Sequence, residues 1–381
     1  MTRIVAVRPS SLERMSDSEH LFTPLTLRGV TFPNRLVVSP MCQYSSVDGF
    51  ANDWHLVHLG SRAAGGAGLV IVEATAVEAR GRISYGDLGI WQDEHIDFLR
   101  RITAFIKSQG AVAGIQLAHA GRKASCELPW NGDTVIHPEA TNGWQAVAPS
   151  PLPFRPGDPV PQALTKNEIR HTLQLFADAA KRAVAAGFEV IEIHAAHGYL
   201  LNEFLSPVSN HRADEYGGSF TNRVRLALEV VEAIRAEMPQ HMPLFLRISA
   251  TDWTDGGWTI DDSVALARLV APLGVDLIDA SSGGNVLDAK IPVGPGYQVQ
   301  FAERIRREAK ILTAAVGMIT GAEQADAVIR AGQADFILLA REFLRDPYFP
   351  LHAAQQLKAP VLSPNQYLRA FAHSTPRPAR E

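Results

Sequence analysis

Short apolar runs alternate with amphipathic stretches along most of the chain. Eight apolar runs, rich in Val, Ile and Leu, occur at residues 35–41, 69–77, 111–118, 189–195, 243–249, 275–280, 311–316 and 334–340. Runs that are nearly continuous in apolarity are typical of parallel strands buried on both faces. The stretches between them, such as residues 167–186 and 222–237, repeat apolar positions at spacings of three and four and predict helices.

Glycines mark the ends of the predicted helices. Gly187, Gly274 and Gly332 each stand between a helical stretch and the next apolar run, the usual place for a glycine that ends a helix. Eight strand and helix units in alternation predict an α/β fold, a single (β/α)8 TIM barrel. An open doubly wound sheet is the alternative, but the turn after the first run reads PMCQYSS and lacks a G-x-G-x-x-G fingerprint.

Two segments lie outside this repeat. Residues 21–34 predict a β-hairpin that turns at Arg28-Gly29 and caps the bottom of the barrel. Residues 121–165 form a long, Pro-rich excursion after the third strand, and such a connection is typical of a lid or binding loop. We expect residues 1–18 to be a mobile tail and residues 19–381 to form the barrel with a C-terminal extension.

The composition excludes several functional classes. Lys+Arg 36 against Asp+Glu 40 gives a net charge of -4, so no global basic field attracts nucleic acid or an anionic membrane. The 2 cysteines, Cys42 and Cys126, are too few for a disulfide framework, a structural zinc or an iron–sulfur cluster. No stretch approaches the roughly 20 apolar residues of a membrane span. These observations predict a soluble, cytoplasmic protein.

Polar residues gather at the carboxyl ends of the predicted strands, where barrel enzymes carry their active sites. They include no lysine placed for a Schiff base and no carboxylate cluster for a metal, so we expect no metal ion. Gly317 and Arg341 follow the last two strands, the recurrent phosphate site of this fold. A glycine lets the backbone approach a phosphate closely, and a guanidinium can bind it bidentately. A turn glycine and a surface ion pair are the alternative reading.

The segment HAAHGYLLNEFLSP has the highest density of chemically useful side chains. It places His194, His197 and Tyr199 within six residues at the end of the fourth strand. Two imidazoles can donate hydrogen bonds to one carbonyl oxygen and stabilise the negative charge that develops there. Tyr199 can supply a proton as a general acid. Purely structural roles are the alternative.

Together with further motifs, this segment resembles the Old Yellow Enzyme family. The motifs are SPMCQYS, EATAV, QLAHAGRKA, HAAHGYLLNEFLSP, N-H-R-x-D-x-Y-G-G-S over residues 210–219, ASSGG and LAREFLRDP. They occur in order on nearly every predicted strand, and the resemblance extends from Leu21 to the C-terminus. The chain looks most like the bacterial xenobiotic-reductase or thermophilic-like branch.

The resemblance implies a bound FMN and an ene-reductase that uses NADPH or NADH. Reduced FMN would transfer hydride to the β-carbon of an electron-poor alkene (an enone, maleimide or nitroalkene), held by His194 and His197, while Tyr199 protonates the α-carbon. The implied FMN contacts are Ser39, Pro40, Met41, Cys42 and Ala74 along the isoalloxazine, Gln116 at the pyrimidine edge, Arg247 near N1, and Gly317, Ala340 and Arg341 at the phosphate.

The resemblance also suggests how the substrate pocket is completed. Cys42 would tune the flavin potential, with a buried structural thiol as the alternative, and Tyr44 would border the substrate. Arg369, after Gln366-Tyr367, is a candidate to reach the site of a neighbouring subunit, which implies a homodimer or a dimer of dimers; a solvated tail charge is the alternative.

The chain also departs from some relatives. They carry tryptophans where this chain has Val316 and Phe371, so we expect a roomier pocket. Cys126 receives no role.

Other activities remain open at this point. Reduction of nitro compounds or nitrate esters is the main alternative, and a dienoyl-CoA reductase is disfavoured because the chain lacks cluster cysteines and extra domains. A flavin-free lyase or aldolase would use only the phosphate site. The choice between NADH and NADPH has no fingerprint in the sequence.

Overall fold

Eight parallel strands close into a barrel in the computed structural model, which describes residues 19–132, 134–371 and 374–376. The strands are β3 (Leu36–Val38), β4 (Leu69–Ala76), β5 (Val112–Ala118), β8 (Val190–Ala195), β9 (Leu244–Ser249), β10 (Leu277–Ser281), β11 (Leu312–Ala315) and β12 (Phe336–Leu339). They follow one another around the barrel in chain order, and β12 pairs with β3 to close it. Each of the eight predicted apolar runs coincides with one of these strands, although β10 extends one residue beyond its run, to Ser281. The barrel prediction is therefore confirmed.

Some strands are shorter than the apolar runs that predicted them. β3 ends at Val38, close before Pro40, which has no N–H for a ladder hydrogen bond. β12 ends at Leu339, because Ala340 leaves the extended conformation and begins a short helix. Both strands therefore end where the chain turns toward the barrel mouth.

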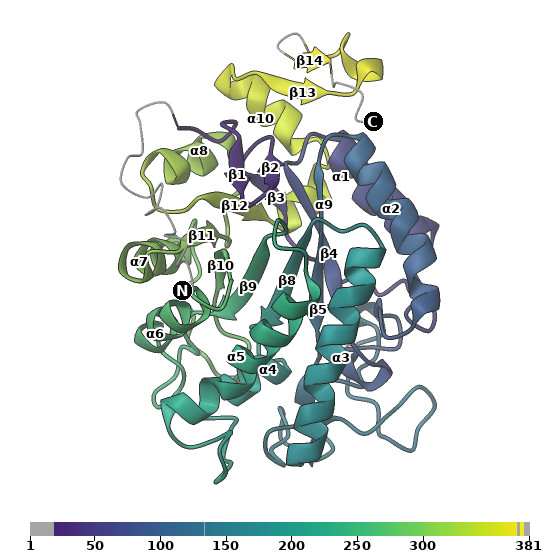
Figure 1. Ribbon diagram of the computed structural model, residues 1–381, viewed down its shortest axis with the longest axis vertical. Coiled ribbons are helices and arrows are strands. Elements are labelled where there is room, and N and C mark those ends of the chain that lie inside the picture. The colour runs from purple at the N-terminus through teal and green to yellow at the C-terminus, as the bar shows by residue number, and fades with distance from the viewer. Residues whose placement is uncertain (1–18, 133, 372–373, 377–381) are drawn as a thin grey trace, which may run out of the picture.

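Helices cover the outside of the barrel (Figure 1). They are α1 (Asp53–Ala64), α2 (Ile96–Ser108), α3 (Lys166–Ala185), α5 (Phe220–Glu237), α6 (Ile260–Val270), α7 (Val299–Ala309), α8 (Ala322–Arg330) and α10 (Phe349–Leu357), with the short α4 (Leu200–Leu205) and α9 (Arg341–Arg345) added at strand ends. Thr165 and Glu168 form a capping box that starts α3, which satisfies N–H groups left unpaired by the first turn. Gly187 follows α3 with φ +85°, as its predicted position at the helix end requires.

The N-terminal hairpin closes the bottom of the barrel, as predicted. β1 (Leu25–Leu27) pairs antiparallel with β2 (Val30–Phe32), and the turn falls at Arg28 and Gly29. Phe32 is fully buried, with its ring centre 5.0 Å from that of Phe336 and 6.3 Å from that of Phe245. Because these rings fill the barrel axis from below, the interior is a packed core at this end.

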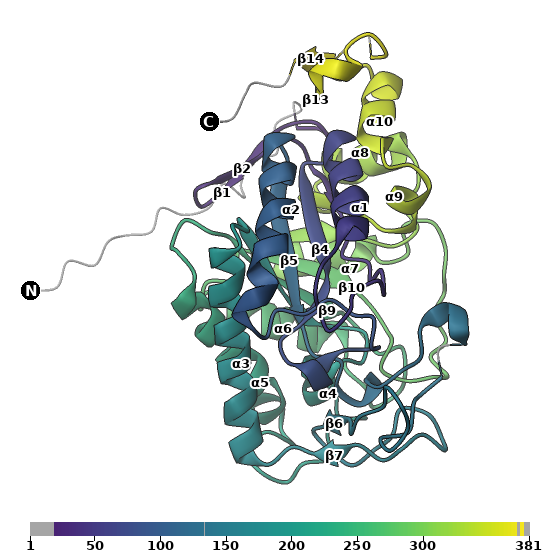
Figure 2. The same cartoon turned by 90° about the vertical axis from the view of Figure 1, so that its right-hand side faces the viewer.

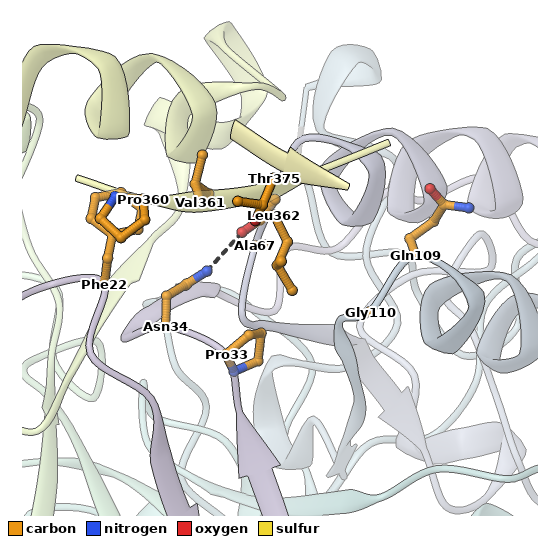
Figure 3. A pocket seen from close by; sticks show the side chains of 11 residues that line it. Phe22, Pro33, Asn34, Ala67, Gln109, Gly110, Pro360, Val361, Leu362 and Thr375 are labelled. Atoms are coloured by element: carbon orange, nitrogen blue, oxygen red, sulfur yellow. Dashed lines mark hydrogen bonds between the residues drawn. The ribbon is translucent and has the colours of Figure 1, made fainter. Parts of the chain in front are cut away.

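The C-terminal extension lies at the same end as the hairpin. β13 (Val361–Ser363) and β14 (Ser374–Pro376) form a two-stranded sheet there, whereas β6 (Val147–Ala148) and β7 (Gln162–Ala163) lie at the opposite end (Figure 2). A cavity of about 110 Å³ separates the extension from the barrel floor, with Pro33 and Asn34 on one side and Val361 and Leu362 on the other (Figure 3). This cavity is remote from the carboxyl ends of the strands, and we assign it no function. The predicted tail, residues 1–18, lies outside the described residues.

Candidate functional site

The barrel register gathers polar side chains at the carboxyl ends of its strands. Gln116 on β5 is paired in register with Glu192 on β8, His194 on β8 with Arg247 on β9, and Arg247 with Asp279 on β10. In parallel strands, residues in register lie side by side. Residues that are up to 163 positions apart in the sequence therefore form one layer near the barrel mouth.

His194, His197 and Tyr199 form a compact group at the end of β8. The ring centres of His194 and His197 are 5.2 Å apart, and those of His194 and Tyr199 are 5.0 Å apart, both pairs nearly perpendicular at 89° and 87°. His197 has a φ of +61° and Gly198 a φ of +73°. A Cβ on Gly198 would lie 2.3 Å from the carbonyl oxygen of Gly284, so only glycine allows this turn to pack against the end of β10.

Hydrogen bonds fix the orientation of both imidazoles. The backbone N–H of Ala196 donates to Nδ1 of His194 (3.2 Å), which leaves the proton of the neutral ring on Nε2. His197 is held by Ser249, whose Oγ accepts from its backbone N–H (2.8 Å), and by Ser281, whose Oγ lies 2.7 Å from its Nε2. If Ser281 donates its hydroxyl proton, His197 keeps an N–H at Nδ1 for a ligand.

Electrostatics keep this group uncharged at neutral pH. Burial, reinforced by Arg247, lowers the pKa of His194 and of His197 well below the ordinary histidine value. Burial, with smaller contributions from Cys42 and Tyr44, raises the pKa of Tyr199 well above its ordinary value. The site therefore presents two neutral imidazoles and a protonated phenol.

A buried charged layer lies beside this group. The Gln116 amide donates to Oε1 of Glu192 (2.8 Å), and Nε of Arg247 lies 3.1 Å from Asp279 Oδ2. Burial and the neighbouring Asp279 raise the pKa of Glu192 to about 8, so this carboxyl carries a proton at neutral pH. A further N–H of Arg247 donates to Oγ of Ser39 (2.9 Å).

This layer is incompletely hydrogen-bonded among the described residues. Glu192 Oε2 and Asp279 Oδ1 have no hydrogen-bond partner there, and Arg247 Nε and Asp279 Oδ2 contact each other only as an ion pair. Buried polar groups in native proteins are nearly always satisfied. A polar ligand or ordered water at the barrel mouth fits this pattern.

The ends of β11 and β12 form a separate cavity of about 260 Å³. It is lined by Gly317, Met318, Ala340 and Arg341, among others. Gly317 has a φ of +117°, and a Cβ there would lie 2.7 Å from Nε2 of Gln298. Arg341 is exposed and forms no ion pair with a described carboxylate, so a backbone cradle and an uncompensated guanidinium face one cavity. Backbone N–H groups and a guanidinium are hydrogen-bond donors suited to bind a phosphate group.

Cys42 and Tyr44 follow β3 at the mouth. Cys42 is partly exposed, and burial of its sulfur, with Asp87 and Glu73 nearby, raises the pKa of the thiol well above its ordinary value. It is therefore a neutral thiol rather than a nucleophilic thiolate. Ser39 is buried, and Pro40 and Met41 are half-buried beside it.

Tyr44 and Tyr199 face a common cavity of about 170 Å³. Seven of its ten lining residues belong to the excursion: Arg122, Lys123, Cys126, Val135, Phe154, Arg155 and Asp158. The excursion thus roofs the space beside the phenol, as expected of a lid or binding loop.

Three predicted residues do not join the site within one chain. Arg369 is exposed and belongs to the C-terminal extension, whose strands β13 and β14 lie at the end opposite β6 and β7 (Figure 2). Val316 packs in the barrel interior and borders the cavity of Gly317, and Phe371 lies against His352, with ring centres 6.0 Å apart. Neither Val316 nor Phe371 lines the cavity shared by Tyr44 and Tyr199.

Several residues that shape the site were not predicted from the sequence. Ser281 orients His197, and Nζ of Lys123 donates to the carbonyl oxygens of His197 (2.9 Å) and Gly284 (3.1 Å). Glu192 and Asp279 hold Gln116 and Arg247. A signal for these two carboxyls was present, because each is an acidic residue inside an otherwise apolar strand.

The described part of the chain contains no group of three or more His, Cys, Asp or Glu side chains that could hold a metal ion. None of its helices has the length and apolarity needed to cross a membrane.

Comparisons with known proteins give a consistent picture. A model of the NADH:flavin oxidoreductase / NADH oxidase family matches residues 20–359. An NADPH dehydrogenase of Geobacillus sp. (strain WCH70) is 51% identical over 353 residues, which cover 92% of this chain and 98% of the relative. Morphinone reductase in complex with tetrahydroNAD has a TM-score of 0.73 at 28% identity and covers 91% of this chain and 93% of its own. The old yellow enzyme homologue from Zymomonas mobilis has a TM-score of 0.73 at 26% identity, with 94% and 98% covered.

Proposed function

This chain belongs to the NADH:flavin oxidoreductase / NADH oxidase family, that of Old Yellow Enzyme, and we propose that it is an FMN-dependent ene-reductase. It is an NAD(P)H-dependent flavin oxidoreductase, and the proposal concerns its cofactor, its substrate and its residues. The substrates we propose are electron-poor alkenes such as enones, maleimides and nitroalkenes. We assign FMN binding to the barrel of residues 19–381.

One observation carries the proposal: two neutral imidazoles and a protonated phenol lie together at the barrel mouth. The ring centre of His194 is 5.2 Å from that of His197 and 5.0 Å from that of Tyr199. A hydrogen bond from a neutral imidazole stabilises negative charge on a carbonyl or nitro oxygen while leaving the site without a competing acid. The N–H of a neutral imidazole is a far weaker acid than a phenol, so Tyr199 is the most acidic of the three groups and the one suited to supply the proton. This arrangement suits addition of hydride and proton across an activated C=C bond.

The residues at the mouth also fit FMN. Gly317, Ala340 and Arg341 would hold the phosphate, while Gln116 and Arg247 would face the polar edge of the ring. Ser39, Pro40, Met41, Cys42 and Ala74 would line its length. A bound FMN would supply the hydride chemistry, which would move hydride from NAD(P)H to the β-carbon of the alkene. The neighbour solved with tetrahydroNAD supports a nicotinamide donor.

Each residue of the group has a distinct part in the proposal. His194 and His197 bind the substrate oxygen and orient the alkene, and Tyr44 borders the alkene. Tyr199 protonates the α-carbon, and the ammonium of Lys123, 5.1 Å from the centre of the Tyr199 ring, stabilises the phenolate that remains. Phe154 and the rest of the excursion exclude water from this cavity.

We also propose a homodimer, or a dimer of dimers, in which Arg369 completes the site of a neighbouring subunit. Arg369 is exposed and is not drawn into an ion pair with a described residue of its own chain. A guanidinium in that position would bind the polar end of a substrate.

The proposal is tested on the purified protein and its two half-reactions. We expect FMN to be released on denaturation, and absorbance near 450 nm to bleach with NADPH or NADH and return with cyclohexenone under anaerobic conditions. A screen of cyclic enones, maleimides, nitroalkenes and nitrate esters would rank the substrate classes. A colourless protein that FMN cannot reconstitute would refute the proposal, and turnover of nitrate esters alone would replace it by xenobiotic reduction.

A further inference from the structure

A second, larger cavity opens beside the proposed substrate site. Its volume is about 620 Å³, and Tyr44 lines both this cavity and the smaller one shared with Tyr199. It is formed by the segment after β3, by the segment after β4 and by the excursion, so it too lies at the carboxyl ends of the strands. Its charged and aromatic lining comprises Tyr44, Asp48, Arg80, Arg82, Tyr85 and Trp144.

Arg82 is the cation of this cavity that has no carboxylate partner. Nε of Arg80 is paired with Glu78 at 2.9 Å, whereas no carboxylate of the described residues forms an ion pair with Arg82. Nε of Arg82 donates to the carbonyl oxygen of Ala79 (2.8 Å), and its guanidinium lies over Trp144, 5.1 Å from the ring centre. The side chain is therefore fixed in place, and its charge is offset only at longer range, by Asp87 and Asp48.

The aromatic wall behind Arg82 is also fixed. The guanidinium lies over a second tryptophan, Trp91, at 5.4 Å, and Nε1 of Trp144 donates to the carbonyl oxygen of Arg80 (2.9 Å). A guanidinium in contact with two indoles loses little further freedom when it binds an anion. The exposed carboxylate of Asp48 lines the same cavity and partly opposes this charge.

The position of the cavity indicates its ligand. Because NAD(P)H and the alkene both exchange hydride with the flavin in the proposed function, we place the nicotinamide ring beside Tyr44 and Tyr199, where the alkene would bind. The rest of the dinucleotide is too large for a cavity of about 170 Å³ and must leave past Tyr44. The adjoining cavity of about 620 Å³ supplies the room and a guanidinium suited to phosphate.

We propose that this cavity binds the phosphate groups of the adenosine half of NAD(P)H, with Arg82 as the phosphate ligand and Asp48 as an opposing charge. This inference rests on the proposed function, because it assumes that nicotinamide is the hydride donor. In either case Arg82 binds a phosphate group. This group is either the 2′-phosphate of NADPH or the diphosphate that NADH and NADPH share.

The test measures binding of adenosine 2′,5′-bisphosphate and of ADP to the flavin-loaded protein by titration calorimetry. Neither probe carries a nicotinamide, so the readout is independent of turnover. We expect Arg82→Gln to weaken binding about five- to tenfold, as expected for loss of one partly exposed charge contact. Arg82→Lys should restore part of the affinity, and the matched variant Asp48→Asn should tighten it.

The two probes separate the sources of the phosphate. A loss confined to adenosine 2′,5′-bisphosphate would place the 2′-phosphate at Arg82 and predict a preference for NADPH, whereas equal losses would place the diphosphate there. Absence of binding for both probes, or affinities that neither Arg82→Gln nor Asp48→Asn changes while the fold and flavin content are intact, would overturn the inference.

A nicotinamide donor without any phosphate, 1-benzyl-1,4-dihydronicotinamide, separates the proposed function from the inference about the cavity. It lacks both the adenosine half and the diphosphate, so its reduction of the flavin in the wild type does not depend on the cavity of Arg82. If it reduces the flavin and the calorimetry is negative, only the inference about the cavity fails. If no reduced nicotinamide donates hydride, the proposed function fails with it.

Discussion

The imidazole of His194 meets the phenol ring of Tyr199 edge to face, with ring centres 5.0 Å apart and planes at 87°. Such perpendicular packing of aromatic rings stabilises a fixed mutual orientation. A hydrogen-bond donor for the substrate oxygen and a proton donor for the α-carbon are thereby held as one unit. Their positions depend on each other, and their roles can still be separated by experiment.

Removing the Tyr199 hydroxyl should impair one half-reaction selectively. Tyr199→Phe keeps the ring that packs against His194 and loses only the proton source, so we expect enone reduction to slow about 100-fold. Reduction of the flavin by NADPH requires no proton from Tyr199 and should proceed at the wild-type rate. Stopped-flow absorbance follows both steps, and an equal loss in the two would argue against the proton-donor role.

Cys42 should influence the flavin without acting as a nucleophile. Because its thiol is neutral at the mouth of the barrel, Cys42→Ala replaces a polarisable group by a methyl and should move the flavin midpoint potential by about 30 mV, equivalent to a tenfold change in the two-electron equilibrium. Cys126→Ala is the matched control, since Cys126 lies in the excursion. Identical potentials in both variants and the wild type would remove this role.

Arg369 should act between subunits. We expect Arg369→Ala to raise the KM for the enone about tenfold, the usual scale for loss of one charged hydrogen bond, with no change in flavin content. Analytical ultracentrifugation of the wild type should show a dimer or larger assembly. If a variant truncated from Arg369 onward retained full activity and the same mass in solution, Arg369 would have no role between subunits.

Glu203 should make the stability of the fold depend on pH. It is fully buried, and burial raises its folded-state pKa to about 8, above the value of about 4.3 in an unfolded chain. The folded state therefore holds this proton when the unfolded state has lost it. The contribution of the protonated Glu203 carboxyl to the free energy of unfolding is complete below the unfolded pKa, and it is lost as the pH rises through about 8.

Glu203→Gln cannot ionise, so its unfolding free energy should vary less between pH 5 and pH 9 than that of the wild type, by about 4 kcal/mol. Urea denaturation at several pH values gives this difference. Glu232→Gln, on the exposed face of α5, is the control. If the unfolding free energy of Glu203→Gln changed with pH as steeply as that of the wild type, Glu203 would not titrate as its burial requires.

The repeating pattern of the sequence determined the barrel, because eight nearly continuous apolar runs can be buried only as parallel strands covered on both faces. It also located the residues at strand ends, since alternation places every carboxyl end at one rim. His194, His197, Tyr199, Cys42 and Arg247 were found in this way. The turn at Arg28 and Gly29 also predicted the N-terminal hairpin.

Only the tertiary structure decided which of these residues touch. Register between strands brings Arg247 to Asp279 and Gln116 to Glu192, and local sequence patterns do not encode pairings across 32 and 76 residues. The structure also showed that Ser281 and Lys123 fix His197, that the excursion roofs Tyr199, and that Arg82 stands beside a cavity without a described carboxylate partner. Protonation states follow from burial, a property of the packed fold, and for that reason the neutral imidazoles and the neutral thiol became visible only once the chain was folded.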